Sequence, residues 1–379
     1  MDSSTVANHS QTLQFIRRGV LVIGILCIVM MYFFTTINQH QGNKNQPAFM
    51  VKSYSAKVNH MTSNSVKLNN ETVKVLYYNR PEWVSGKEFS SCKNRCELIS
   101  GSKALSSAKF VIFHGPRLTS TVPPKKSRGQ VWIMHGMESP VHYFVDLSNW
   151  KNVFNWTFTF RRDSDVTCLY SDFQYFQESN KSMSDQWKVK NRTAAWMVSN
   201  CRTPSKRDKY VRHLRKSADV HIYGKCGAYK CPKSTESSCL GILKKHYRYY
   251  LGFENSLCVD YVTEKGYKTY RFSPSTIPVL RGGLNYSLYF PPGSYLDTKN
   301  FESAIALGKT MSANTIDNLD RFFAWTKYFS KKPNLMATDK WCDLCKHIHN
   351  AENYKRLYSN IKHWLDDYHR GGCKFPTDL

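Results

Sequence analysis

Acidic residues are scarce in this chain: its 379 residues include 28 Asp and Glu against 54 Lys and Arg, a formal net charge of +26. This deficit favours anionic partners, such as nucleic acid, acidic lipid, phosphate-bearing substrates or sulfated glycans. The sequence also lacks internal self-similarity and long low-complexity runs, which excludes a repeat protein. Its length suits two domains better than one.

Charge is absent from one long stretch, GVLVIGILCIVMMYFFTTI at 19–37, which is nearly all apolar. At about 1.5 Å per residue, a helix of this length just crosses a bilayer core of roughly 30 Å. A cleaved signal peptide is the alternative, but its apolar core is usually shorter. Because Arg17 and Arg18 precede the stretch, we predict a cytosolic tail at 1–18, an uncleaved transmembrane anchor at 19–37 and a body across the membrane.

Two further features indicate an oxidising secretory compartment for that body. Eleven of the twelve cysteines follow the anchor, and disulfides form and persist in such compartments. Beyond the anchor, N-x-S/T acceptors for glycans occur at Asn70, Asn155, Asn180, Asn191 and Asn285. Nucleic acid is therefore not expected as a partner, whereas a nucleotide-sugar remains open.

Short apolar runs beyond residue 71 predict two series of buried strands. Residues 38–71, rich in Asn, Gln, Ser and Lys without an apolar period, are typical of a stem. The first series of strands lies at 73–79, 110–115, 131–136 and 154–160. The second series lies at 194–200, 220–227, 247–255 and 277–283.

Helical patterns accompany the second series. They lie at 206–218, from Tyr261 onward, at 316–329 and at 353–368. Strand and helix in alternation are the signature of a parallel α/β sheet. Two such series predict two nucleotide-binding-like halves, 72–193 and 194–379, which face a cleft, with the C-terminal helices in the second half.

The stretch FENSLCVDYVTEK, residues 253–265, leads from a predicted strand into a predicted helix. With Asp260 as the N-cap, Tyr261, Glu264 and Lys265 would share one face of the first turn. Free N–H groups and the helix dipole attract anions there, and open α/β sheets bind ligands at the carboxyl ends of their strands. The stretch predicts a diphosphate site; an exposed helix with an ordinary Glu–Lys pair is the alternative.

The polar side chains of this stretch suit a nucleotide-sugar. Lys265 and the Tyr261 hydroxyl can contact phosphate oxygens. Glu264 can accept hydrogen bonds from sugar hydroxyls, and Asn255 can donate or accept from the strand end.

FENSLCVDYVTEK closely resembles the donor-binding signature of the α-1,3-fucosyltransferases, glycosyltransferase family 10. Similar motifs occur in the family's order, so the resemblance spans about residues 72–379; they lie at 131–140, 154–166, 198–214, 220–227, 277–301 and 342–345. The resemblance implies the GT-B fold, an α/β fold of two Rossmann-like domains facing a central cleft, preceded by an N-terminal transmembrane helix. It also implies a single-pass type II Golgi membrane protein with a lumenal catalytic domain, GDP-fucose as donor, a glycan acceptor and inversion at the anomeric carbon.

The resemblance assigns roles to single residues. The positions that match the family's donor-binding residues are Arg207, Asn255, Tyr261, Glu264 and Lys265. Arg207 would hold the diphosphate and, with Lys265, stabilise the leaving GDP. Glu138, in MESP, matches the family's proposed base, which takes the acceptor's proton on the face opposite the leaving group. A Glu in an ordinary strand-to-loop turn is the alternative.

Asp163 and Asp165 form a D-x-D pattern that could hold a metal ion on a diphosphate, so a metal-dependent transferase is a competing hypothesis. Arg161 and Arg162 stand beside them, which favours ion pairing within the protein. In the family the matching motif is not a metal ligand. We therefore expect no required cofactor and leave stimulation by Mn²⁺ or Mg²⁺ open.

Two close cysteine pairs could form a zinc site, although a lumenal chain favours disulfides. The six disulfide candidates are Cys92, Cys96, Cys226, Cys231, Cys342 and Cys345. The family pattern implies pairing either within each short loop, 92–96 and 342–345, or between the two loops. Pairing of Cys226 with Cys231 is also expected, although sequence alone does not determine connectivity.

Gly266 departs from the family, which has a bulky apolar residue there, and weakens the helix by roughly 1 kcal/mol relative to Ala. This departure keeps open a catalytically weak, glycan-binding member of the same fold. His114 and His135 follow strands of the first half and could line the acceptor cleft or simply be packed. We predict transfer of L-fucose to O3 of N-acetylglucosamine in N-glycans or lactosamine-type glycans, with core or antenna and a 1,3 or 1,4 linkage left open.

Overall fold

The computed structural model describes residues 71–171, 173–175, 183–231, 236–313, 319–331, 339–366 and 372–379. These residues belong to one unit of the chain, Leu68–Leu379. The predicted cytosolic tail, the anchor and, apart from Glu71, the stem lie outside the described residues, as do Asn70 and Asn180. No helix within the described ranges combines the length and the apolar character that crossing a bilayer requires.

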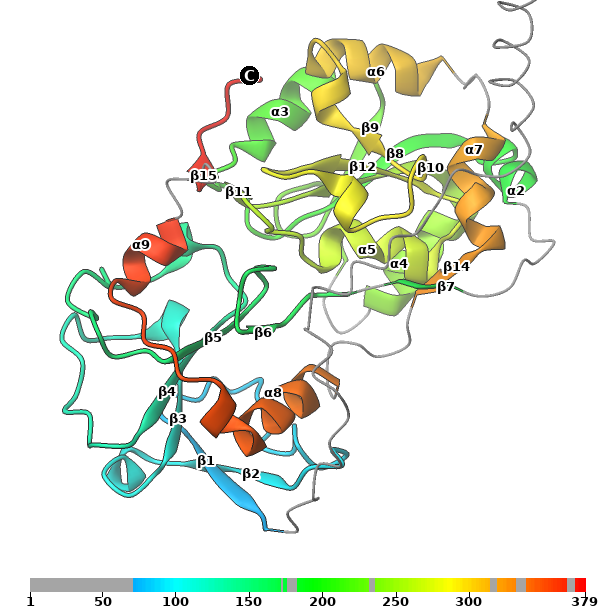
Figure 1. The fold of residues 1–379 in the computed structure, drawn as a ribbon. Helices are drawn as coiled ribbons and strands as arrows, with labels where there is room; N and C mark the ends of the chain where they lie inside the picture. Colours follow the sequence, from blue (N-terminus) through cyan, green and yellow to red (C-terminus); the bar gives the residue numbers. More distant parts are fainter. Residues whose placement is uncertain are drawn as a thin grey trace, which may run out of the picture. The chain divides into compact units, whose positions relative to one another are not determined.

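The first sheet is parallel and has the strand order β2-β1-β3-β4-β5-β6 (Figure 1). Its strands are β1 (Val73–Tyr77), β2 (Cys96–Ser100), β3 (Phe110–His114), β4 (Val131–Gly136), β5 (Trp156–Thr159) and β6 (Val166–Thr167). Strands β3 and β5 are buried along their whole length, although β5 alternates aromatic residues with threonines. All four predicted strands are confirmed. The edge strand β2 escaped prediction because only Leu98 in it is buried.

The second sheet is also parallel, with the order β13-β12-β10-β8-β9. Its strands are β8 (Arg192–Met197), β9 (Val220–Tyr223), β10 (Tyr247–Phe253), β12 (Ile277–Arg281) and β13 (Leu296–Asp297). The four strands predicted for this half are confirmed, and within this sheet only the two-residue β13 was missed.

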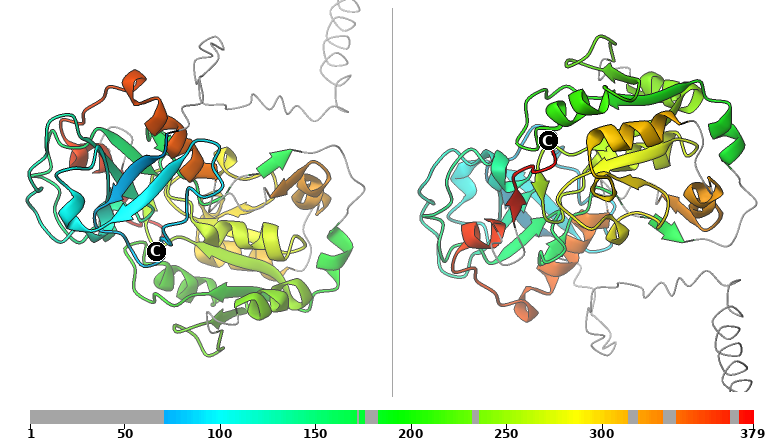
Figure 2. Two further views of the ribbon diagram at one scale, coloured as in Figure 1. Left: turned by 90° about the horizontal axis from the view of Figure 1, so that it is seen from below. Right: turned by 90° about the horizontal axis from the view of Figure 1, so that it is seen from above.

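Helices cover both faces of the second sheet, as the opposite views in Figure 2 show. They are α3 (Arg207–Leu214), α4 (Glu236–His246), α5 (Glu264–Phe272) and α6 (Ala304–Ser312). Successive residues of β10 point to opposite faces. Tyr249 and Leu251 pack with side chains of α3 and α6, whereas Tyr250 packs with side chains of α4. The sheet is therefore doubly wound, as two nucleotide-binding-like halves require.

Both sheets place their strands in the same way: the first strand lies between the second and the third. The chain thus changes direction between β1 and β3 in one sheet and between β8 and β10 in the other. Ligands of doubly wound sheets bind at this switch point, beyond the carboxyl ends of the strands. The topology itself therefore marks two binding edges, one on each half.

The C-terminal helices belong to the first half, which corrects the predicted domain boundaries. Side chains of α8 (Asp339–His349) and α9 (Ile361–Asp366) are buried in the cores on the first sheet. Conversely α2 (Ser184–Lys188) inserts Trp187 into the core of the second half, ahead of the predicted boundary at 193/194. Reading strands and helices in chain order cannot detect a chain that returns to an earlier sheet.

Shorter elements complete the described fold. Strand β7 (Phe173–Tyr175) pairs antiparallel with β14 (Phe329–Lys331), and β11 (Leu257–Cys258) pairs antiparallel with β15 (Cys373–Lys374). The helix predicted at 316–329 is present in part, as α7 (Asp320–Phe323) and a 3-10 turn. Of the helix predicted at 353–368, the described residues form only α9.

Five disulfides connect ten cysteines of the described residues. They are Cys92–Cys342, Cys96–Cys345, Cys201–Cys226, Cys231–Cys239 and Cys258–Cys373. The first two confirm bridges between the two loops, so these thiols are not available to zinc. The predicted Cys226–Cys231 bridge is wrong. Cys226 meets Cys201 because the two follow neighbouring parallel strands, β9 and β8, which end at the same sheet edge.

Candidate active site

A cavity of about 540 Å³ lies at the switch point of the second sheet. Its wall includes the residues that follow β8 and β10, in keeping with the topology. Four of the five predicted donor-binding residues line it: Arg207, Asn255, Glu264 and Lys265. Glu138, the predicted base, lines it too, from the first half of the chain. The structure therefore brings together residues from both halves, up to 127 positions apart in sequence.

Helix α5 begins at Glu264, three residues later than predicted, so Asp260 is not its N-cap. Asp260 has a left-handed backbone, with φ of 57°, and the chain becomes extended again at Thr263 before the helix starts. The Asp260 carboxylate instead accepts hydrogen bonds from the Arg162 N–H at 3.1 Å and the Tyr289 hydroxyl at 2.8 Å. Tyr261 precedes the helix and cannot share its first face with Lys265.

Thr263 occupies the N-cap position that was predicted for Asp260, and Glu254 holds Thr263 in place. The buried carboxylate of Glu254, 2% exposed, accepts hydrogen bonds from the Thr263 N–H at 2.8 Å and the Thr263 hydroxyl at 2.7 Å. Lys265 Nζ lies 3.5 Å from the same carboxylate. Burial raises the pKa of Glu254, and Lys265 opposes this shift. The sequence showed an acidic residue at the end of a strand, but nothing in it distinguished this buried carboxylate from an exposed Glu.

Lys265 supplies a positive charge at the start of α5. Its ammonium lies 3.4 Å from Glu264 and donates to Thr263 Oγ1 at 2.7 Å. Burial alone would lower its pKa, but the carboxylates of Glu254 and Glu264 outweigh burial and raise it. Burial likewise favours a raised pKa for Glu264, which Lys265 and Lys268 overcome, so its pKa is lowered. The cavity wall therefore keeps its charges at neutral pH.

Arg207, the first residue of α3, is 3% exposed and is held by two backbone carbonyls. Its Nη1 donates to the Phe253 carbonyl at 2.7 Å and its Nη2 to the Asn200 carbonyl at 3.1 Å. Its Nε is buried and finds no hydrogen-bond partner among the described residues. Burial lowers the pKa of Arg207 while Glu254 acts to raise it. A buried guanidinium with an unused donor, facing a cavity, is suited to an anionic ligand.

Glu138 follows β4 and is exposed, with Oε2 accepting a hydrogen bond of 2.9 Å from the Tyr261 hydroxyl. Tyr261 itself is 1% exposed and lies beside Glu138 instead of in the lining of the 540 Å³ cavity. Burial raises the pKa of Tyr261 well above 10, so the phenol stays a donor at neutral pH. The adjoining loops are also tied together, since Ser139 donates to Ser256 at 2.8 Å.

A second cavity, of about 470 Å³, opens on the first half and shares Glu138 with the first cavity. His114 and His135 line it, at the carboxyl ends of β3 and β4, and both are also packed, with 3% and 4% of their surface exposed. Burial lowers the pKa of His114 to about 4 and that of His135 to about 3, so both imidazoles are neutral. Trp83, 61% exposed, lines it as well and was not predicted. A single exposed Trp outside any periodic run gave no signal in the sequence.

The D-x-D carboxylates are both engaged within the first half. Asp163 accepts from Arg161 Nε at 2.9 Å and Nη2 at 2.7 Å, which confirms the predicted ion pairing. Asp165 accepts from the Tyr358 hydroxyl at 2.8 Å and from Arg356 at 2.9 Å. Neither Asp lines either of the two cavities.

Comparison with known proteins places these observations in a family. Residues 187–364 match the family model "Glycosyltransferase family 10 (fucosyltransferase) C-term", and residues 70–171 match "Fucosyltransferase, N-terminal". A solved α1,3-fucosyltransferase with GDP-fucose shares 15% identity with a TM-score of 0.46, covering 67% of this chain and 81% of that one. A likeness of that size adds nothing to the assignment.

Curated relatives are closer. Alpha-(1,3)-fucosyltransferase C of Drosophila melanogaster is 31% identical over 71% of this chain and 69% of its own length. Human Alpha-(1,3)-fucosyltransferase 7 is 30% identical over 72% of this chain and 78% of its own length. Glycoprotein 3-alpha-L-fucosyltransferase A of Drosophila melanogaster is 31% identical over 71% of this chain, which spans 54% of that relative. The chain therefore belongs to glycosyltransferase family 10, the family of the α-1,3-fucosyltransferases, and is an enzyme of that family.

Proposed function

We propose that this enzyme transfers L-fucose from GDP-fucose to O3 of N-acetylglucosamine in N-glycans or lactosamine-type glycans, with inversion at the anomeric carbon and with Glu138 as the base. The observation that carries the proposal is the position of Glu138. Its exposed carboxylate lines both cavities, one on each half of the chain, and Tyr261 holds it in place. A base between donor and acceptor must reach both substrates.

The 540 Å³ cavity is the proposed donor site. Arg207, Lys265 and Lys268 provide positive charge, and the first turn of α5 provides N–H groups and the positive end of its dipole. These groups suit a diphosphate, whose charge increases as the bond to fucose breaks. Asn255 and Glu264 remain for the hydroxyl groups of the sugars.

The 470 Å³ cavity is the proposed acceptor site. Its neutral histidines can exchange hydrogen bonds with sugar hydroxyls, and the exposed ring of Trp83 offers an apolar face to a sugar ring. The acceptor O3 would attack the anomeric carbon from this side while its proton passes to Glu138 and GDP departs on the other side. The bond to the β-phosphate oxygen breaks as the bond to O3 forms.

Localisation and metal dependence are parts of the same proposal. The five disulfides support an oxidising compartment for the body, and residues 19–37 would anchor it to the Golgi membrane as a single-pass type II protein with the catalytic domain in the lumen. Because the carboxylates of Asp163 and Asp165 are committed to internal partners, we propose that no metal is required. Full activity in EDTA is the expected result, and its loss would restore the metal-dependent alternative.

The test combines a glycan panel with two variants of the full-length chain. Product formed from GDP-fucose is analysed for its linkage and for the core or antenna position. Glu138→Gln should lower turnover by about 10²–10⁴-fold, the usual contribution of a general base, with GDP binding retained. Lys265→Ala should weaken GDP binding itself. Retained turnover in Glu138→Gln would remove this base, and GDP binding without transfer by the wild-type chain would favour the catalytically weak, glycan-binding alternative.

A further inference from the structure

A third cavity, of about 980 Å³, lies at the opposite edge of the first sheet from Glu138. Its lining includes residues at the amino ends of three neighbouring strands: Lys109 just before β3, Val131 in β4 and Trp156 in β5. Glu138 follows the carboxyl end of β4. At about 3.3 Å per residue, the six residues of β4 separate the two edges by roughly 20 Å. This cavity is therefore not part of the donor or acceptor site proposed above.

The lining of this third cavity is strongly basic. It contains five cations and one carboxylate, which belongs to Glu352; the cations are Lys109, Lys126, Arg128, Lys355 and Arg356. Two of the five have polar partners, since Arg356 pairs with Asp165 at 2.9 Å and Lys126 bonds to Asn155, and the Lys109 ammonium lies 5.6 Å from the centroid of the Phe110 ring. The other three are exposed, and none of the ion pairs between described residues involves them. Repulsion between these like charges is relieved when an anion binds.

Asn155 holds the back wall of the cavity in place. Its Oδ1 accepts from the Trp132 N–H at 2.9 Å and from Lys126 Nζ at 2.6 Å, while its Nδ2 donates to the Arg356 carbonyl at 3.0 Å. Asn155 is one of the predicted glycan acceptors, and a glycan is attached through Nδ2. A glycan at this position would break the bond to Arg356 and fill the cavity. Asn191 and Asn285, which are exposed, face no such conflict.

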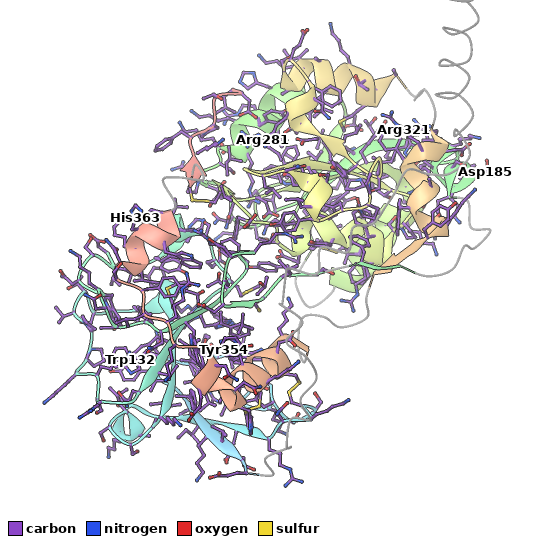
Figure 3. The ribbon with its side chains drawn as sticks, viewed as in Figure 1. Trp132, Asp185, Arg281, Arg321, Tyr354 and His363 are labelled. Carbon is purple, nitrogen blue, oxygen red and sulfur yellow. A yellow bond between two sulfur atoms is a disulfide. The ribbon has the colours of Figure 1, made fainter. Side chains whose placement is uncertain are left out.

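The shape and the rim of the cavity indicate which anion fits. A bilayer is flat and would contact a protruding basic cluster, whereas a concave site encloses a chain or a small molecule. Tyr354 and Leu357, 45% and 52% exposed, add apolar surface at the rim. The Tyr354 ring (labelled in Figure 3) stacks on His347 with centroids 3.7 Å apart, which holds it in place. Cations around a fixed aromatic rim match the sulfate or carboxylate groups and the apolar ring faces of an acidic sugar chain.

We propose that this basic cavity, at the amino ends of β3, β4 and β5, binds a sulfated or carboxylated oligosaccharide, with Lys109, Arg128 and Lys355 as the anion-binding side chains. The site is separate from the chemistry at Glu138. It would dock acidic glycan chains on the half of the enzyme that also carries the proposed acceptor cavity.

The experiment measures binding of a heparin-derived hexasaccharide to the full-length chain, purified in a mild nonionic detergent, by calorimetric titration. The double variant Arg128→Glu/Lys355→Glu should bind at least about tenfold more weakly, the effect of losing one charge-assisted contact. The matched control, Lys216→Glu/Lys309→Glu, changes net charge equally at two exposed positions of the other half, one in the turn after α3 and one in α6. Its affinity should stay within about twofold of wild type if the cavity and not the total charge binds the ligand.

Three further measurements make the outcome decisive. A neutral hexamer of N-acetylglucosamine should not bind at the same concentrations, and unchanged thermal unfolding of the double variant excludes misfolding. Transfer of fucose to a small neutral acceptor should be unaffected by Arg128→Glu/Lys355→Glu. Equal weakening in both double variants, or binding of phosphatidylserine vesicles through Arg128 and Lys355 in place of the hexasaccharide, would overturn the proposal.

Discussion

Replacing Gly266 with Ala tests whether close packing between α5 and β10 positions the donor cavity. Ala is the better helix former by about 1 kcal/mol, so propensity alone predicts a gain in stability. The surroundings predict the opposite. A Cβ built on Gly266 would lie 2.7 Å from Cζ of Phe290 and 3.4 Å from Cδ2 of Leu280. A separation below about 3 Å forces one of the groups to move.

Phe290 has little room to move. It is 3% exposed and stacks on Tyr270 with centroids 5.4 Å apart, while Tyr267 lies 4.6 Å from it on another side. Overpacking of a filled core typically destabilises by about 1–3 kcal/mol. After subtraction of the gain in helix propensity, we expect Gly266→Ala to lower the free energy of unfolding by up to about 2 kcal/mol. For a chain of this size that corresponds to a fall in Tm of at most about 3 °C.

The control is Gly241→Ala in α4, where a new Cβ meets no atom within 4 Å. This variant should be stabilised by up to about 1 kcal/mol. In the Gly266→Ala background, Phe290→Leu should recover part of the lost stability, because a smaller side chain relieves the contact. Thermal unfolding of all four proteins and GDP titration of each would check the reasoning. If Gly266→Ala stabilises as much as Gly241→Ala does, packing against Phe290 does not constrain α5.

Two other expectations follow from charged groups and a third from a disulfide. Asp378→Asn removes a bidentate ion pair with Arg281, which is 2% exposed and lies beside the C-terminal segment in Figure 3. The free energy of unfolding, measured by denaturation, should therefore fall by about 1–3 kcal/mol. The affinity for GDP, measured by titration, should fall as well. Burial lowers the pKa of Lys190 to about 7. Between pH 7 and 9 the unfolded chain then binds more protons than the native one, so the free energy of unfolding should rise with pH by at most about 1.4 kcal/mol per pH unit. Lys190→Met should remove this slope. Lys188→Met, at an exposed position, should leave it unchanged. Reduction of Cys258–Cys373 should loosen the pairing of β11 with β15, seen as faster amide exchange there.

Much of the fold could be predicted from sequence because buried parallel strands are continuous apolar runs. β3 is such a run, β5 and β10 are interrupted only by Thr or a single Arg, and the order of these strands in the chain sufficed to predict two nucleotide-binding-like halves. The return of α8 to the first sheet could not be predicted in this way. The contacts that hold it, including Cys92–Cys342, join positions 250 residues apart, and a local pattern carries no record of them.

The site was predictable to the extent that its residues stand at strand ends and helix starts. Asn255, Glu264 and Lys265 meet in one cavity for that reason. Asp260 was assigned wrongly because Asp is both a good N-cap and a residue that tolerates the left-handed conformation it adopts here. Here the Asp260 carboxylate bonds Arg162 and Tyr289, and the N-cap position of α5 falls to Thr263.

The sequence and the structure give different accounts of Gly266. From the sequence alone, Gly266 is a residue that weakens the helix next to Lys265. For that reason the hypothesis of a catalytically weak family member stayed open. In the structure Gly266 and Gly252 let α5 approach β10, since a Cβ on Gly252 would lie only 3.2 Å from the Gly266 Cα. Gly266 therefore has a packing role in this chain besides its effect on helix propensity.

Hydrogen bonds around Glu138 should affect the turnover rate of the enzyme. Tyr261 bonds its carboxylate, Ser139 bonds Ser256, and the N–H of Arg162 bonds Asp260. Each of these bonds joins the first half to the segment between β10 and α5, so the elements that shape the donor cavity also set the position of the proposed base. Reactive groups held in place in this way act mainly on turnover, because little reorganisation remains when both substrates are bound. Weakening one of these bonds, as in Tyr261→Phe, should therefore lower kcat more than it raises the KM for GDP-fucose, whereas a Tyr261 that contacted phosphate would show the reverse.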